Sequence, residues 1–340
     1  MNFLEELKAS LDNRDKIYNL IRQHPIDTIE NLFLLPSPND DSKRVRITLN
    51  RAQKQLITYA LQSKDIFALG STQIAGKTTA AALLAAYVII AYPGIQVYYL
   101  SLKDELAMDF QSRVLKIIDS CVPVLRPNYK RQINQNKVVL FDNTSVLRVS
   151  GINKHYKDPN YLFKQLTVHI LIMDEFANIK QNARMLELAT TRLAASRSML
   201  KGVYPSSLIL LSNAVALTSE ESRFAFKLWY DTTRNETAYS PILFYYRDLI
   251  PEQEAERYIY EEYKRTRNKR QILINYECMF LPDNDSFIDD DDILNQLIQN
   301  KSTVYQYFIE DENGEPIVML NAYKDINLYR FQTLSTLELT

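Results

Sequence analysis

The segment STQIAGKT, which begins at Ser71, has the residue types of a phosphate-binding loop. It fits the pattern G-x-x-x-x-G-K-[ST] except at its first position, because Ser71 replaces the glycine and Gly70 lies one residue too early. In this pattern Gly76 lets the backbone approach a phosphate, and Lys77 neutralises the β- and γ-phosphates. Thr78 offers a hydroxyl to Mg²⁺, and the N-terminus of the following helix adds N–H donors. The loop residues predicted to contact a nucleotide are Ser71, Thr72, Gln73, Ile74, Ala75, Gly76, Lys77, Thr78 and Thr79.

A pair of acids follows the apolar run Ile170–Met173 in the sequence HILIMDEF. The run predicts a buried strand, and Asp174 and Glu175 emerge at its carboxyl end, where open α/β sheets bind their ligands. Asp174 is predicted to bind Mg²⁺, and Glu175 to polarise an attacking water. Glu175 and Lys77 are thus the predicted catalytic residues. For the acid dipeptide alone, a strand that ends in two solvated carboxylates is a common alternative.

Two weaker signals accompany these motifs. Gln53, in LNRAQKQL, precedes the first strand, and its amide can pair with a donor and an acceptor on an adenine edge. Ser212 and Asn213, in LILLSNA, end another apolar strand, where small polar residues suit the sensing of a γ-phosphate. Taken alone, Gln53 is more typical of a surface glutamine, so both signals depend on their order along the chain.

Strands and helices alternate around these motifs. Strands are predicted at about 66–71, 95–101, 168–175 and 207–214, a strand pair at 137–151, and helices at 49–63, 77–92, 103–120 and from Asn182. This alternation predicts a mostly parallel sheet with helices on both faces. Residues 34–44, rich in Pro, Ser, Asn and Asp, predict an exposed loop. Beyond Pro251 we expect one or two charged helices and a tyrosine-rich, β-like tail with a turn at ENGEP.

The stretch from Thr78 to Leu102 carries no charge, so a membrane helix has to be considered. A span needs about 20 apolar residues. The helical part here ends near Tyr92, because Pro93 and Gly94 stop it. We therefore predict a helix buried inside a globular fold, and no membrane contact.

Composition sets broad limits on the class of protein. The net charge of -1 argues against attraction of the whole molecule to nucleic acid, so a polyanion contact needs a local basic patch. Cys121 and Cys278 match no metal-ligand spacing, which favours reduced thiols. The first 23 residues mix acids and bases at helical spacing, unlike a signal peptide. These features predict a cytosolic protein.

The order of these motifs resembles the ATPase half of the large terminase subunit of tailed bacteriophages, the motor that packages DNA into a procapsid. The resemblance covers roughly residues 49–294, and only the loop and the acid pair are specific. It implies a RecA-like P-loop (ASCE-type) NTPase fold in the α/β class, with a mostly parallel central sheet flanked by helices and a small C-terminal subdomain. The implied divisions are residues 1–45 (N-terminal helix and linker), 46–250 (ATPase core) and 251–340 (transition subdomain).

The resemblance also implies roles and partners. It implies adenine contact for Gln53, phosphate contact for Gly76, Lys77 and Thr78, metal binding for Asp174, catalysis for Glu175, and coupling for Ser212 and Asn213. The implied cofactors are ATP and Mg²⁺. The implied partners are double-stranded DNA, a portal protein, a small terminase subunit and a separate nuclease chain. A homo-oligomeric ring on the portal, in the host cytoplasm, is the expected assembly.

Two departures from the family pattern matter. Family loops commonly carry an arginine just after the first position, where this chain has Thr72 and Gln73. The candidates to replace that arginine follow the acid pair; they are Arg184, Arg192 and Arg197, although surface arginines are the alternative for each. Only 46 residues follow Leu294, so we expect no nuclease activity from this chain.

A basic cluster lies in YKRTRNKR, and it predicts contact with the DNA backbone without base reading. Its members are Lys264, Arg265, Arg267, Lys269 and Arg270. A solvated helix face is the alternative. The acidic run Asp289–Asp292 is better explained as the first turn of a helix than as a metal site. Two rival functions remain open at this point: a RecA-like helicase or translocase, and an ATP-binding structural subunit that scaffolds a nuclease or portal.

Overall fold

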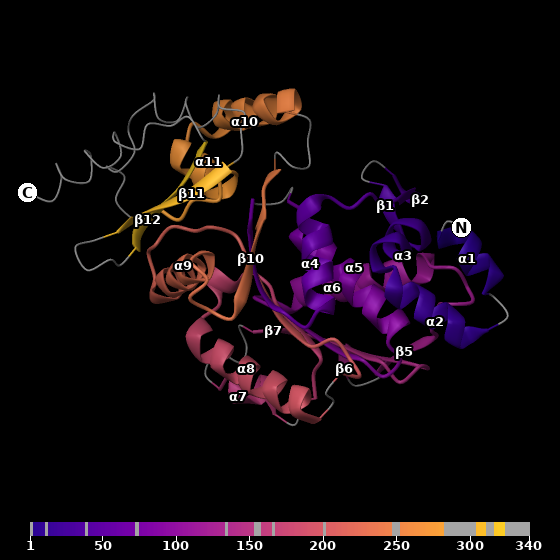
Figure 1. Cartoon of the computed structure of the whole chain (residues 1–340). Helices are drawn as coiled ribbons and strands as arrows, with labels where there is room; N and C mark the ends of the chain where they lie inside the picture. Colours follow the sequence, from indigo (N-terminus) through magenta and orange to yellow (C-terminus); the bar gives the residue numbers. More distant parts are fainter. Residues whose placement is uncertain are drawn as a thin grey trace, which may run out of the picture.

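A central eight-stranded sheet organises the computed structural model (Figure 1). The structure describes residues 3–10, 13–37, 40–71, 75–132, 135–152, 158–164, 167–199, 202–246, 252–281, 304–310 and 316–323. The strands lie in the order β10-β3-β9-β8-β4-β7-β6-β5. Their bounds are β3 (Asp65–Gly70), β4 (Gln96–Ser101), β5 (Tyr129–Gln132), β6 (Gln135–Phe141), β7 (Val146–Gly151), β8 (Ile170–Met173), β9 (Ser207–Ser212) and β10 (Tyr239–Phe244). The strands from β10 to β7 pair in parallel, and β6 and β5 extend the sheet antiparallel. The predicted mostly parallel sheet is confirmed.

Helices cover both faces of this sheet, because residues alternate along each buried strand. Ile66 and Ala68 of β3 belong to one apolar cluster, and Phe67 and Leu69 to the other. The first face carries α4 (Arg51–Leu61), α5 (Lys77–Ala91) and α6 (Asp104–Ser120). The second carries α7 (Asn160–Phe163), the 3₁₀ turn η1 (Phe176–Asn178), α8 (Asn182–Met199) and α9 (Glu220–Thr233).

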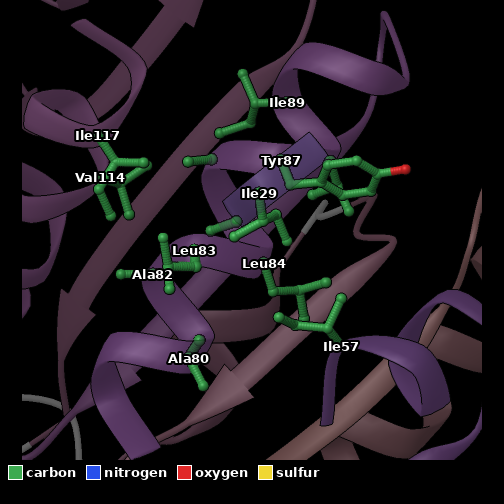
Figure 2. Packing of buried hydrophobic residues seen from close by; sticks show 14 of the residues in the cluster. Ile29, Ile57, Ala80, Ala82, Leu83, Leu84, Tyr87, Ile89, Val114 and Ile117 are labelled. Atoms are coloured by element: carbon green, nitrogen blue, oxygen red, sulfur yellow. The ribbon is translucent and has the colours of Figure 1, made fainter. Parts of the chain in front are cut away.

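Helix α5 explains the uncharged stretch of the sequence. It is buried on all sides from Ala80 to Ala91 (Figure 2), since α4, α6 and the N-terminal helices pack around it and the sheet lies beneath it. A helix with no solvent-facing side has no position that requires a charge. Within the described ranges, no helix combines the length and hydropathy that a bilayer crossing needs.

The N-terminal part holds α1 (Phe3–Ala9), α2 (Arg14–Gln23) and α3 (Pro25–Leu32), followed by a β-hairpin. The hairpin corrects the exposed loop predicted for residues 34–44. Strands β1 (Leu34–Ser37) and β2 (Asp40–Arg46) pair antiparallel. The backbone N–H of Leu34 also donates to Ser120 Oγ at the end of α6, 3.0 Å away. This hydrogen bond joins the hairpin to α6, a long-range contact that the local composition does not indicate.

The C-terminal part contains two helices where one or two charged helices were predicted, α10 (Glu252–Thr266) and α11 (Lys269–Asn275). A second hairpin, β11 (Val304–Glu310) with β12 (Pro316–Tyr323), confirms the β-like tail. The central residues of the ENGEP turn and the acidic run Asp289–Asp292 lie outside the described residues.

Candidate functional site

The phosphate loop joins the end of β3 to the N-terminus of α5, as its pattern requires. Gly76 caps α5 with φ +72°, a left-handed conformation that favours glycine. A Cβ there would also lie 2.8 Å from Gln53 Nε2, so no side chain fits without displacing that amide. Ala75 is buried beside it, whereas Thr72, Gln73 and Ile74 lie outside the described residues.

Lys77 reaches from α5 to two neighbouring strands. Its Nζ donates to the Ser71 carbonyl at 2.9 Å, after β3, and to Asn213 Oδ1 at 2.6 Å, after β9. Burial lowers the pKa of Lys77, while the nearby Cys278, Asp174 and Glu175 act in the opposite direction. The two hydrogen bonds use two of the three donors of the ammonium, which leaves one for a phosphate oxygen.

Asp174 follows β8 and is held by three donors. Thr78 Oγ1 donates to Oδ2 at 3.1 Å, and the buried Tyr99 hydroxyl donates to the same oxygen at 2.6 Å. The backbone N–H of Glu175 donates to Oδ1 at 3.0 Å. Tyr99 in turn stacks on Phe110 of α6, with ring centroids 3.7 Å apart. The carboxylate is therefore fixed next to the threonine hydroxyl at the start of α5.

Glu175 has a backbone conformation that is unusual for a residue with a side chain, φ 60° and ψ 38°. Such strain typically costs about 1–3 kcal/mol and is often found at functional sites. Asn213 Nδ2 donates to its Oε1 at 3.3 Å, and Asn178 Nδ2 to its Oε2 at 3.2 Å. Burial raises the pKa of Glu175, and the neighbouring Asp174 adds to the shift, whereas Lys77 and the Asn178 hydrogen bond oppose it.

The donor set fits Mg²⁺ and a nucleotide phosphate. Two partly buried carboxylates, Asp174 and Glu175, face one ammonium, Lys77, so a divalent cation would balance their charge. Thr78 and Asp174 are in direct contact and offer the oxygen ligands that Mg²⁺ prefers. The described residues contain no group of three His, Cys, Asp or Glu side chains that could hold a metal. Phosphate oxygens and water would therefore supply the remaining ligands.

Other predicted residues surround this centre. Gln53 completes a capping box with Asn50 and donates to the Gly76 carbonyl at 3.4 Å, so it lies at the loop. Ser212 Oγ accepts from the Ala177 N–H at 3.1 Å and so joins β9 to the turn after the acid pair.

The sequence analysis missed Asn178, which donates to Glu175, and two further residues at this site. Tyr99 is one, and Arg113 of α6, whose guanidinium donates to Thr79 Oγ1 at 3.0 Å, is the other. Both belong to elements whose position beside the loop depends on the order of strands in the sheet, which no local pattern reveals.

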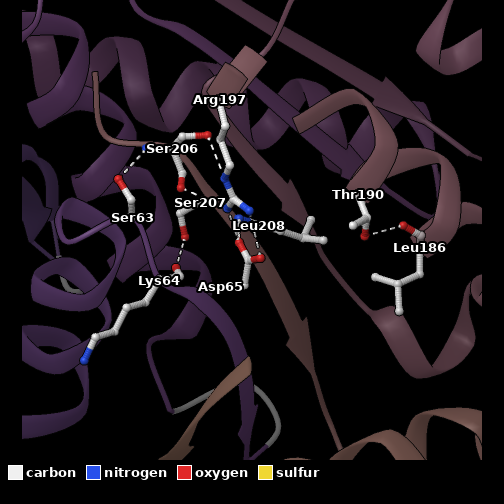
Figure 3. A network of polar contacts seen from close by, with 9 residues as sticks. All are labelled: Ser63, Lys64, Asp65, Leu186, Thr190, Arg197, Ser206, Ser207 and Leu208. Carbon is white, nitrogen blue, oxygen red and sulfur yellow. Dashed lines mark hydrogen bonds and ion pairs between the residues drawn. The ribbon is translucent and has the colours of Figure 1, made fainter. Parts of the chain in front are cut away.

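The three candidate arginines lie on α8, on the face of the sheet opposite α5. Arg197 binds Asp65 with two hydrogen bonds (Figure 3). Asp65 is the first residue of β3, and the phosphate loop follows the other end of this strand. Arg184 pairs with the exposed Glu187 at 2.6 Å, and Arg192 is half-buried. In the described part of the chain, none of the three has a hydrogen bond or ion pair to the acid pair.

The basic cluster lies where α10 meets α11. Lys264 Nζ is 4.3 Å from the centre of the exposed Tyr260 ring, and Arg265 pairs with Glu262 at 2.6 Å. Arg267 is exposed between the helices with φ 51°. Lys269 begins α11, and Arg270 is half-buried.

Several solved structures are similar to this chain. No protein-family model and no curated protein sequence matches the chain. The large terminase of bacteriophage HK97 is 12% identical with a TM-score of 0.54, over 85% of this chain and 62% of that one. The large terminase of the thermophilic bacteriophage D6E, in complex with ADP, is 14% identical with a TM-score of 0.50, over 68% and 54%. Its complex with ATP-γ-S is 15% identical with a TM-score of 0.50, over 69% and 53%.

These likenesses confirm the fold. The chain has the α/β, RecA-like fold of large terminases and spans about half of the D6E protein and 62% of the HK97 protein.

Proposed function

We propose that this chain is the ATP-hydrolysing motor domain of a viral DNA-packaging terminase, which couples Mg-ATP hydrolysis to translocation of double-stranded DNA into a procapsid. One observation carries the proposal: Lys77, Thr78, Asp174, Glu175 and Asn213 meet at the carboxyl ends of β3, β8 and β9. They do so on a fold shared with large terminases, one of which was solved with ADP.

Each residue has a separate task in this proposal. The first-turn N–H groups of α5 and the Lys77 ammonium bind the phosphates. Thr78 and Asp174 would hold Mg²⁺, which would supply positive charge against the phosphates. Glu175 accepts a hydrogen bond from the attacking water and orients it, and Asn213 bridges Lys77 and Glu175. Asn213 is thus positioned to report loss of the γ-phosphate to β9.

The ATPase proposal is tested by turnover and binding together. We expect Glu175→Gln to bind ATP but to lose about 10²–10⁴-fold in turnover, because a water-orienting base is removed. Lys77→Ala should weaken ATP binding itself in an equilibrium titration. Glu187→Gln, an exposed acid on α8, is the control and should match the parent. Parental turnover in Glu175→Gln would refute its role.

DNA binding is proposed from the basic cluster and the family resemblance. A triple variant, Lys264→Ala with Arg265→Ala and Arg267→Ala, should lower DNA affinity and reduce the slope of log affinity against log salt. The reduction should reach up to about 0.9 for each DNA phosphate that the variant no longer neutralises. The exposed helical lysines Lys8 and Lys16 give a control pair. An unchanged slope would remove the cluster from the proposal.

The remaining expectations about partners and assembly stay predictions. They are a portal, a small terminase subunit, a separate nuclease chain and ring assembly in the host cytoplasm. The expected lack of nuclease activity is a prediction of the same kind.

An ATP-binding subunit without turnover is the second candidate. It is favoured by one observation, that no candidate arginine on α8 reaches the acid pair within the described residues. Measuring phosphate release by the chain alone, and then with double-stranded DNA, separates the two functions. ATP binding without phosphate release in either condition would support the subunit.

A further inference from the structure

Ser71, the residue that departs from the phosphate-loop pattern, has its side chain bound to a distant part of the chain. It is fully buried, and its Oγ donates to the Tyr276 carbonyl at 2.7 Å and accepts from the Tyr246 N–H at 3.2 Å. Cys278 Sγ lies 3.4 Å from the same oxygen. These partners occupy the hydroxyl, and the Ser71 N–H donates to the Phe244 carbonyl at 3.0 Å, so in this structure both donors of Ser71 are bound to the protein and not directed at the predicted nucleotide.

The partner of Ser71 is the segment 276–281 that follows α11, here named the exit segment. All of its residues are buried: Tyr276, Glu277, Cys278, Met279, Phe280 and Leu281. The Glu277 carboxylate accepts hydrogen bonds from the hydroxyls of Tyr245 and Tyr246, which directly follow β10. The segment is thus held against the strand that neighbours β3.

The other end of the exit segment is joined to the loop after β9. Leu281 forms a parallel bridge with Ala216, and its carbonyl accepts from the Leu217 N–H at 2.8 Å. The same loop begins with Asn213, whose Oδ1 accepts from Lys77. The Lys77 ammonium is held by the Ser71 carbonyl and the Asn213 amide. The loops of both residues are therefore bound to the exit segment.

We infer that Ser71 is a positioning residue that couples the phosphate loop to the exit segment, and through it to α10 and α11. A phosphate bound by the third donor of Lys77 draws on the ammonium that the Ser71 carbonyl and the Asn213 amide hold, so a shift of Lys77 is felt at both ends of the segment. Glycine, the pattern residue at this position, has no hydroxyl and cannot make this connection. The inference rests on the proposed function, since it needs a nucleotide at Lys77.

Hydrogen exchange of the full chain, with and without saturating Mg-ATP, tests the coupling. In the parent, ATP should slow exchange in residues 276–281 by about fivefold or more, which is the low end of typical coupling between sites. Ser71→Ala at saturating ATP should lose this difference. If the hydroxyl had only a structural role, its removal would raise exchange equally with and without Mg-ATP. The difference that ATP makes would then remain. Ser150→Ala, a buried serine at the end of β7, is the matched control and should keep the parental response.

The outcomes separate this inference from the proposed function. If the parent does not bind ATP, the proposed function fails. If the parent binds ATP but exchange in the exit segment does not respond, the coupling by Ser71 is refuted. The coupling is also refuted if the parent responds and Ser71→Ala responds in the same way. Ser71→Gly restores the pattern residue and serves as the second variant if Ser71→Ala does not fold; it should lose the response in the same way.

Discussion

Replacing Arg197 by alanine should weaken the fold and leave the chemistry intact. The guanidinium donates to both carboxylate oxygens of Asp65, at 2.5 and 3.2 Å, and to the carbonyl and hydroxyl of Ser206, at 3.0 and 3.3 Å (Figure 3). The same Asp65 accepts from the Leu208 N–H at 2.8 Å. Arg197 therefore ties α8 to the amino ends of β3 and β9.

The magnitude follows from the burial of the pair. The exposed fractions are 34% for the Arg197 side chain and 14% for Asp65, so the pair lies between two limits. Exposed ion pairs contribute about 0–1 kcal/mol, and breaking a buried pair costs about 3–5 kcal/mol. We expect Arg197→Ala to lower the free energy of unfolding by about 2–3 kcal/mol, since Asp65 keeps only its backbone donor.

Urea unfolding followed by the fluorescence of Trp229, the single tryptophan, measures this change. Trp229 is buried and packs edge-on against Phe67 of β3, with centroids 5.2 Å apart, so it reports the integrity of the same strand. Arg184→Ala, which breaks an exposed pair, is the control and should cost less than about 0.5 kcal/mol. The turnover number of Arg197→Ala at 25 °C should stay within about twofold of the parent. A tenfold loss of turnover with unchanged unfolding would refute the structural role and return Arg197 to the catalytic candidates.

Three further predictions concern the nucleotide site. Tyr99→Phe keeps the aromatic ring but removes the hydroxyl that orients Asp174, so the Mg²⁺ concentration that half-saturates ATP binding should rise about tenfold or more; an unchanged Mg²⁺ titration would exclude this role. Arg113→Gln should weaken ATP and ADP binding alike with little change in turnover, because Arg113 binds Thr79, which lies beside the helix N–H groups that bind the α- and β-phosphates. Lys116→Gln on the same helix is the control. A selective loss of turnover in Arg113→Gln would instead indicate a transition-state arginine. Glu175 must be ionised to orient water, and burial raises its pKa. The acid limb of the pH–rate profile should therefore lie above the pH at which an exposed glutamate ionises. An acid limb in the ordinary glutamate range would contradict the role of Glu175.

Much of the fold could be predicted because its core elements have strong local signals. Three elements have a recognisable sequence pattern and a residue that clearly ends it. They are the apolar strand before Asp174, the phosphate loop before Lys77 and the uncharged helix α5. Strand β10 lacked such a signal, since Pro241 interrupts its pattern. The structure explains the proline: among the described strands, β10 pairs only with β3 and lies at the sheet edge, where a missing N–H is tolerated.

The site could be predicted where its residues belong to the phosphate-loop pattern, as Lys77 and Thr78 do, or directly follow a strand. Asn213 and Asp174 each come just after a buried strand, so their types and places were readable. Tyr99 and Arg113 were not, because β4 becomes the neighbour of β8 only through the crossover order of the sheet. The partners of the Ser71 hydroxyl lie between 175 and 207 residues further along the chain, beyond any local pattern.

The burial of α5 determines which parts of a motor built on this chain can move. Its side chains from Ala80 to Ala91 are all inaccessible to solvent or nearly so, and a shift of the helix by one residue would open voids beneath several of them. Each void left by a leucine or isoleucine costs about 2–5 kcal/mol. If the proposed function holds, α5 and the sheet beneath it would form one rigid support for the triphosphate, and movement would come from the loops at the strand ends and from the segments bound to them.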